Sequence, residues 1–250
     1  MRLLGISFLK SCKFKSNWYN SSRKIVTEVV PPQETVDRIP AADPSLVEIL
    51  PSWPETEEPE LRAAVLRDMQ VLPNFVSEEE ESSMVQELEP RLKRMRYEFD
   101  HWDNAIQGYR ETEYSNWNPT NARVMSRVLA TAFQTPAAGE ALPHAHVLDL
   151  ASAGFIKPHI DAVRFCGEVI AGICLLSSAV MRLQHEKLPH LQVDALLERR
   201  AMYIMRGSAR YVFTHAVLGG ERSAWRGARL PRRRRLAVIT RSCPLSEDTK

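Results

Sequence analysis

Apolar residues recur at helical spacing in two stretches of the first half of the chain. Met84, Leu88 and Leu92 stand four positions apart, which predicts an amphipathic helix over residues 77–95. A second stretch with apolar residues along one side predicts a helix over residues 118–133. The start of the folded region is therefore predicted to contribute amphipathic helices.

From about residue 146 onward the pattern changes to short apolar runs, many of them separated by turn residues, and such runs predict β-strands. The predicted strands span residues 146–150, 155–161, 168–176, 180–184, 201–205, 211–214 and 236–240, with an earlier strand at 97–102. Two helices followed by many short strands predict a mainly β fold with flanking helices, in which the helices pack on a β-sandwich or barrel.

The chain before the folded region divides into two segments. Residues 1–28 are serine-rich and basic, with no acidic residue before Glu28, which is typical of a mitochondrial transit peptide; a disordered basic tail is the alternative. Residues 29–66 are rich in proline and acidic residues and predict an extended linker. We expect the folded domain to span residues 67–243 and to be followed by a tail at 244–250.

Composition narrows the class of protein without naming a function. A chain of 250 residues with 44% hydrophobic and 26% charged residues has an ordinary globular balance. The net charge of +2 gives no global electrostatic reason to expect nucleic acid as a partner. The four cysteines form no C-x-x-C pair, so buried free thiols are expected. No apolar stretch reaches the length of a membrane span, and none is predicted.

A short motif at the end of a predicted strand supplies candidate metal ligands. His159 and Asp161 are two residues apart, so on a strand both side chains point to the same face and can reach one metal ion. With a distant third ligand they would form a 2-His-1-carboxylate triad, which suits non-haem Fe(II) oxygenases. The downstream candidates are His185 and His190, in a polar connection, and His215, which ends a predicted strand.

The same spacing occurs a second time in the chain, at His101-Trp102-Asp103. This copy lies among polar and aromatic residues, before the main run of predicted strands begins. We therefore expect it to serve in packing or at the rim of a substrate site rather than as a metal site.

Two arginines near the end of the chain suggest an anion site. Arg235 and Arg241 are six residues apart, so both share one strand face with Ala237 and Ile239. Arginines on a buried face are costly unless they meet anions, and a guanidinium binds a carboxylate through two parallel hydrogen bonds. The other arginines over residues 222–234 are expected to form a solvated basic edge, which leaves contact with nucleic acid open.

Taken in order, His159-x-Asp161, His215 and Arg235-x5-Arg241 resemble the pattern of the AlkB family of Fe(II)/2-oxoglutarate dioxygenases. The resemblance covers roughly residues 70 to 243 and is closest to the short mitochondrial branch of the family. The segments that carry it are Tyr97–Asp103, His146–Leu150, Phe155–Asp161 with Phe165–Gly167, and Arg206–Tyr211.

This resemblance implies a double-stranded β-helix, a form of jelly roll, with Fe(II) at one mouth, 2-oxoglutarate as cosubstrate and molecular oxygen as co-reactant. The implied site residues are His159, Asp161 and His215 as catalytic metal ligands, Arg235 at the distal carboxylate of 2-oxoglutarate, Tyr203 as a hydrogen-bond donor to the same cosubstrate, and Arg241 near its metal-binding end. The implied reaction converts 2-oxoglutarate to succinate and carbon dioxide and hydroxylates a substrate C–H bond; hydroxylation of an N-methyl group results in demethylation.

Two departures from the repair enzymes of this family bear on the substrate. Those enzymes hold the cosubstrate with an Asn-x-Tyr pair where this chain has Leu148-Asp149-Leu150, and they carry a hairpin lid that is not evident here. Duplex DNA is therefore an improbable substrate. A protein substrate in the mitochondrial matrix is expected. The alternatives are demethylation of mitochondrial RNA through the basic edge, and a metal-stabilised interaction module with vestigial catalysis. The branch also implies a role in mitochondrial energy and fatty acid metabolism and in regulated necrosis.

Overall fold

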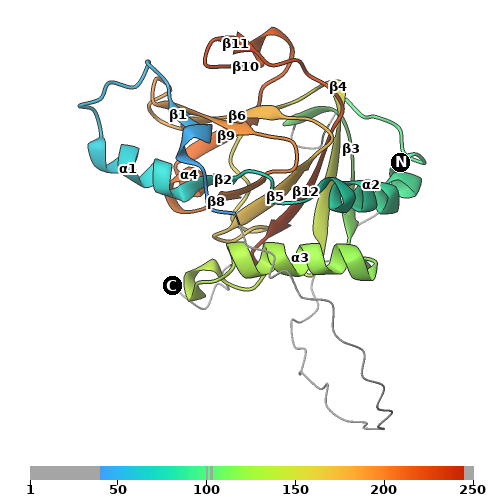
Figure 1. Cartoon of the computed structure of the whole chain (residues 1–250). Helices are drawn as coiled ribbons and strands as arrows, with labels where there is room; N and C mark the ends of the chain where they lie inside the picture. The colour runs from blue at the N-terminus through green and yellow to red at the C-terminus, as the bar shows by residue number, and fades with distance from the viewer. Residues whose placement is uncertain (1–39, 100, 102–103, 245–250) are drawn as a thin grey trace, which may run out of the picture. The chain divides into compact units, whose positions relative to one another are not determined.

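The computed structural model describes residues 40–99, 101 and 104–244. Within these residues an antiparallel sheet curves around an apolar interior (Figure 1). The strands run in the order β1-β7-β6-β9-β4-β12-β5-β8-β2, with β3 paired to β4. Their bounds are β1 (Val47–Ile49), β2 (Met69–Leu72), β3 (Ile106–Tyr114), β4 (Ala145–His159), β5 (Ile170–Leu175), β6 (Ala179–His185), β7 (Gln192–Leu197), β8 (Met202–Met205), β9 (Phe213–Val217) and β12 (Arg235–Arg241). This nearly closed antiparallel barrel confirms the predicted mainly β, jelly-roll core.

Strand β4 joins the two halves of the barrel. Its first half pairs with β12, and its second half pairs with β9, where His159 lies opposite His215. Between the halves, a Cβ atom on Gly154 would lie 2.5 Å from the carbonyl oxygen of Gly108 on β3, so the close approach of these strands requires glycine. Because β4 changes partners at this point, its end faces the strand that carries the distal histidine.

The alternation of side chains along β12 separates two apolar cores. Ala237 and Ile239 face the barrel interior, and Leu236 and Val238 face the opposite side of the sheet. Ala237 and Ile239 therefore share one face of the strand, as their even spacing predicted. One face of β12 is therefore available to line a site inside the barrel, while the other packs against helices.

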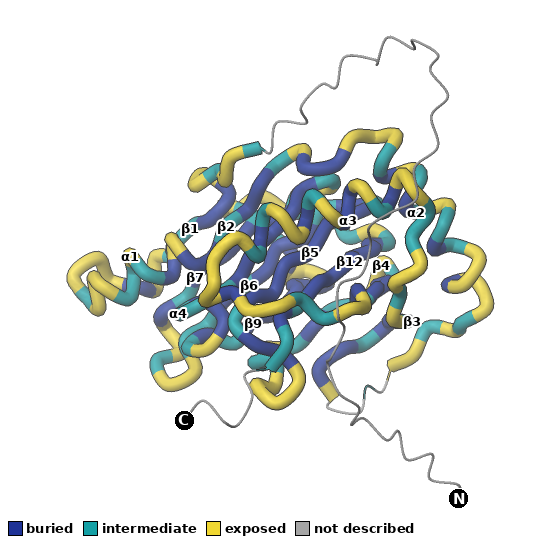
Figure 2. Tube along the Cα trace, turned by 90° about the horizontal axis from the view of Figure 1, so that it is seen from below, coloured by how far each residue is buried: buried dark blue, intermediate teal, exposed yellow. Residues whose placement is uncertain are grey.

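Helices α2 (Glu78–Leu92) and α3 (Pro119–Ala132) cover the outer face of β5, β12 and β4 (Figures 1 and 2). Met84, Leu88 and Leu92 are fully buried there, as their spacing predicts. Ser77 and Glu80 exchange the two hydrogen bonds of a capping box and fix the start of α2. The remaining elements are the helices α1 (Pro59–Asp68) and α4 (Gly207–Tyr211), the 3-10 turns η1 (Pro44–Leu46), η2 (Pro136–Ala138) and η3 (Gly220–Arg222), and the strands β10 (Ala224–Trp225) and β11 (Ala228–Arg229).

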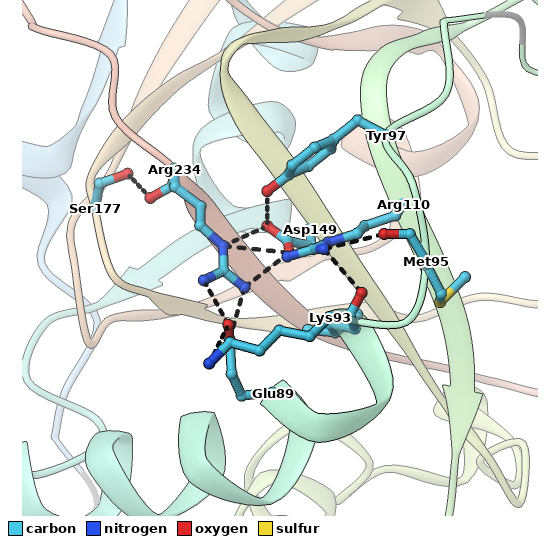
Figure 3. A network of polar contacts seen from close by, with 9 residues as sticks. Glu89, Lys93, Met95, Tyr97, Arg110, Asp149, Ser177 and Arg234 are labelled. Carbon is cyan, nitrogen blue, oxygen red and sulfur yellow. Dashed lines mark hydrogen bonds and ion pairs between the residues drawn. The ribbon is translucent and has the colours of Figure 1, made fainter.

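A buried ion network ties α2 to the sheet (Figure 3). The Asp149 carboxylate, which is fully buried, accepts hydrogen bonds from Arg110 Nε at 2.7 Å and Arg234 Nη2 at 2.8 Å. Tyr97 Oη donates to the same carboxylate, and Arg234 also binds Glu89 of α2. Arg234 is therefore a structural residue, and its assignment to a solvated basic edge is wrong.

The boundary of the folded region differs from the prediction. Strand Val47–Ile49 pairs with β7, and helix Pro59–Asp68 packs into the same unit, so the later part of the predicted 29–66 linker belongs to the domain. The three-residue strand lies between prolines, where sequence periodicity cannot show it. The predicted transit peptide at 1–28 lies outside the described residues.

Strands β3 and β7 were not predicted, and neither were the two-residue strands β10 and β11. Strand β3 is rich in polar residues, and β7 follows the polar connection through His185 and His190. In the predicted strand at 97–102, Glu98 makes only an isolated bridge to Tyr109, and residues 100 and 102 lie outside the described chain. Cys166 and Cys174 are buried free thiols, as expected. No helix within the described ranges is long and apolar enough to cross a membrane.

Candidate metal centre and cosubstrate site

The barrel brings together the three residues that the sequence proposed as a triad. His159 is the last residue of β4, Asp161 follows two positions later, and His215 is the central residue of β9. Their ligand atoms form a compact cluster, with all pairwise separations within 4.8 Å. His185 and His190 lie outside this cluster: His185 is the last residue of β6, and His190, in the connection after it, pairs with Glu57.

The atoms of this cluster are arranged to face a common point. Asp161 Oδ1 lies 3.2 Å from His159 Nε2 and 3.6 Å from His215 Nε2. Neighbouring ligands of an ion with bonds of about 2.1 Å are separated by about 3 Å, so these spacings fit one metal ion. His159 Nδ1 donates a hydrogen bond to the Lys157 carbonyl oxygen at 2.9 Å, which leaves the Nε2 lone pair for the metal.

The surroundings of the triad keep Asp161 and His215 in the protonation states that bind a metal ion. Burial would raise the pKa of the Asp161 carboxyl, but the Arg241 guanidinium and the two histidines outweigh it and hold that pKa well below its usual range. Burial, reinforced by His159, lowers the pKa of His215 to about 3. A carboxylate and a neutral imidazole are the forms that bind metal.

Arg241 connects the triad to the wall of a pocket. Its Nε donates to Asp161 Oδ2 at 2.7 Å, and its Nη1 donates to His146 Nδ1 at 3.0 Å. Because arginine can only donate, His146 Nδ1 accepts, and His146 Nε2 donates to Glu111 Oε2 at 2.8 Å. Glu111 also lies 3.3 Å from His101 Nε2.

The pocket above the triad has a volume of about 900 Å³. His101 lines this pocket, while Trp102 and Asp103 lie outside the described residues. The sequence pattern did not indicate a role for Glu111 or His146, because their pairing depends on β3, which was not predicted. Arg110 to Glu113 are four consecutive polar residues, which do not predict a strand.

Comparison with known proteins supports the same family. The mitochondrial alpha-ketoglutarate-dependent dioxygenase alkB homolog 7 of Mus musculus is 50% identical over 180 residues, covering 72% of this chain and 80% of that protein. Its counterpart from Bos taurus is 49% identical over 187 residues, covering 73% and 83%. The chain belongs to the AlkB family of Fe(II)/2-oxoglutarate-dependent dioxygenases.

No protein-family model matches the chain. The solved structure of OsALKBH1, another AlkB homologue, has a TM-score of 0.49 and 14% sequence identity and covers 70% of this chain and 96% of that one. AlkB-family enzymes use Fe(II), 2-oxoglutarate and oxygen, and the His-Asp-His cluster of this chain fits that requirement for a metal.

Two of the residues expected to contact the cosubstrate of an AlkB enzyme lie inside the barrel. Arg235 and Tyr203 are both buried, and Arg235 lies opposite Leu150 of β4. Arg235 Nη2 lies 3.3 Å from Cys174 Sγ, and its Nε has no hydrogen-bond partner. Burial raises the pKa of Tyr203, so this phenol stays protonated and can donate. A buried guanidinium without a carboxylate partner fits an anionic ligand.

Proposed function

We propose that His159, Asp161 and His215 bind Fe(II), and that Arg235, Arg241 and Tyr203 bind 2-oxoglutarate. The convergence of Asp161 Oδ1 with two imidazole nitrogens is the observation that supports this assignment most directly. When bound, the iron and the keto acid supply the oxidation of a substrate C–H bond by molecular oxygen.

The protein side chains would orient the metal ligand and hold the cosubstrate. Arg241 holds Asp161 by Oδ2 and so leaves Oδ1 free for the metal. Arg235, buried in the barrel, would bind the distal carboxylate, and Tyr203 would donate a hydrogen bond to the same cosubstrate. The pocket wall opposite the triad then positions the substrate carbon.

We propose a protein side chain as the substrate. The pocket carries acidic residues, Glu111 and Glu113, as well as basic residues, Lys157 and Arg164. This mixed wall suits a polypeptide better than a phosphate backbone, which would meet the carboxylates. The engagement of Arg234 in the buried ion network also reduces the basic edge on which an RNA substrate would depend.

The names of the two relatives support a mitochondrial location, and we place the activity in the matrix. A link to energy and fatty acid metabolism and to regulated necrosis rests on the resemblance to the mitochondrial branch alone.

The experiment that tests the substrate class compares matrix protein with matrix RNA. The full chain, loaded with Fe(II) and 2-oxoglutarate, is incubated with each fraction in oxygen, and succinate and substrate mass are measured. We expect extra succinate and an added oxygen on a protein, both lost in His159→Ala. Stimulation by RNA alone would favour the RNA demethylase, and no succinate with either fraction would favour a vestigial module.

A further inference from the structure

The side chain of Arg232 is partly buried, although the residue belongs to a run of four arginines. Its Nε and Nη1 are buried and have no hydrogen-bond partner among the described residues, and its Nη2 makes only a 3.3 Å contact with the Gly154 carbonyl oxygen. Its neighbour Arg233 is exposed. Arg232 is thus partly buried, and two of its three guanidinium nitrogens lack a hydrogen-bond partner.

Arg232 lies near a second guanidinium of the same kind. Arg235 also has a buried, unpartnered Nε, and within the described chain neither arginine forms an ion pair with a carboxylate. Burial and the charge of Arg235 together lower the pKa of Arg232 to about 10. Two neighbouring cations removed from water without an anion are unfavourable, so the arrangement fits an anion from outside the chain.

The strand next to Arg235 presents apolar side chains to the barrel interior. Leu148 and Leu150 face inward from β4, and Leu150 is the paired residue of Arg235 on this neighbouring strand. These are the positions where the repair enzymes have Asn-x-Tyr, so the usual polar contacts to the distal carboxylate are missing on this side.

We propose that Arg232 is a second anchor for the distal carboxylate of 2-oxoglutarate, acting beside Arg235 in place of the contacts that the two leucines cannot make. This inference rests on the proposed cosubstrate site. It assigns to Arg232 a binding role that its position in a basic run would not suggest. A purely structural role, holding Gly154 through Nη2, is the competing explanation.

The test compares two keto acids on the full chain loaded with Fe(II) in the absence of oxygen. 2-Oxoglutarate has the distal carboxylate and 2-oxobutyrate lacks it, while both chelate iron through the same keto acid end. Binding is followed by the visible charge-transfer band of the chelate. Arg232→Gln is the test variant, and Arg233→Gln is its matched, exposed control.

We expect Arg232→Gln to weaken 2-oxoglutarate binding by about tenfold or more, because it loses a charged hydrogen bond. Its affinity for 2-oxobutyrate should be unchanged, and Arg233→Gln should leave both affinities unchanged. Equal weakening for both keto acids, or no weakening for either, overturns the inference. If the unmodified chain binds neither keto acid, the proposed cosubstrate site itself is wrong and the inference falls with it.

A stability measurement separates the two explanations independently. If Arg232 serves to bind an anionic ligand, Arg232→Gln removes an unpaired buried charge. The variant should then not lower the urea concentration at the midpoint of unfolding of the ligand-free protein. If Arg232 instead holds Gly154 in place, the variant should unfold at lower urea, and the binding role is rejected. Should Arg232→Gln fail to fold, Arg232→Lys keeps the charge without the planar fork and is expected to show a smaller loss specific to 2-oxoglutarate.

Discussion

Arg241 donates a hydrogen bond to Oδ2 of Asp161 at 2.7 Å and thereby turns the other oxygen, Oδ1, toward the two histidines. One side chain thus fixes which oxygen of the carboxylate is offered to the metal. The same guanidinium, through Nη1, contacts His146 on the pocket wall. The metal site and the pocket wall are therefore held by a shared residue.

The first prediction concerns this contact. Arg241→Gln should weaken Fe(II) binding about tenfold, because it removes a charged hydrogen bond to a metal ligand. Arg241→Lys keeps the positive charge and should lose less. Anaerobic Fe(II) titration measures both, and equal affinity in Arg241→Gln and the unmodified chain would show that Asp161 does not need this partner.

The second prediction concerns His146, which we interpret as a positioning residue. His146→Gln can still accept from Arg241 and donate to Glu111, whereas His146→Leu can do neither. We expect His146→Leu to raise the KM for 2-oxoglutarate several-fold and His146→Gln to restore most of the loss. Steady-state succinate assays give both constants; identical behaviour of the two variants would argue that only the volume of the side chain matters.

The third prediction concerns stability. Asp149→Asn should lower the free energy of unfolding by about 3 to 5 kcal/mol, because Arg110 and Arg234 would lose their buried counter-charge. Glu89→Gln, at the more exposed end of the network, should cost less. Urea denaturation measures both, and a loss near zero for Asp149→Asn would mean that the network does not stabilise the fold.

The fourth prediction concerns acid stability. Burial would raise the pKa of Glu80, but hydrogen bonds from Arg127 and Ser77 outweigh it and lower that pKa below its ordinary value of 4.5. The ionised form therefore stabilises the fold above the unfolded-state pKa, and this contribution is lost as pH falls through the lower folded-state pKa. Glu80→Gln should flatten the stability profile in this acid range. Arg127→Gln should flatten it in the same way, and an unchanged profile in both variants would exclude the linkage.

Local patterns predicted the parts of the protein that depend on local spacing. Met84 and Leu88 defined α2, and the parity of Arg235 and Ala237 placed β12 correctly. Interactions between distant segments were not accessible. Arg232 and Arg234 belong to one uniform run, yet Arg232 has two buried nitrogens without hydrogen-bond partners and Arg234 binds Asp149 and Glu89. Only the three-dimensional environment distinguishes them.

The polar strand β3 shows the same limit. Its residues include Arg110 and Glu111, which alternate between the buried ion network and the pocket wall. Neither face of the strand has the continuous apolar pattern from which strands are recognised. The contact between Glu111 and His146 therefore became apparent only with the folded chain.

The central claim is that His159, Asp161 and His215 bind Fe(II) for a 2-oxoglutarate-dependent oxidation. Anaerobic titration of the full chain with Fe(II) and 2-oxoglutarate, followed by addition of oxygen, tests it most directly. We predict one Fe(II) per chain, a visible charge-transfer band and succinate on oxygenation. All three should be lost in His159→Ala and His215→Ala and kept in His190→Ala, whose imidazole lies outside the cluster. If His159→Ala binds Fe(II) and 2-oxoglutarate as tightly as the unmodified chain, the metal site has been assigned to the wrong residues.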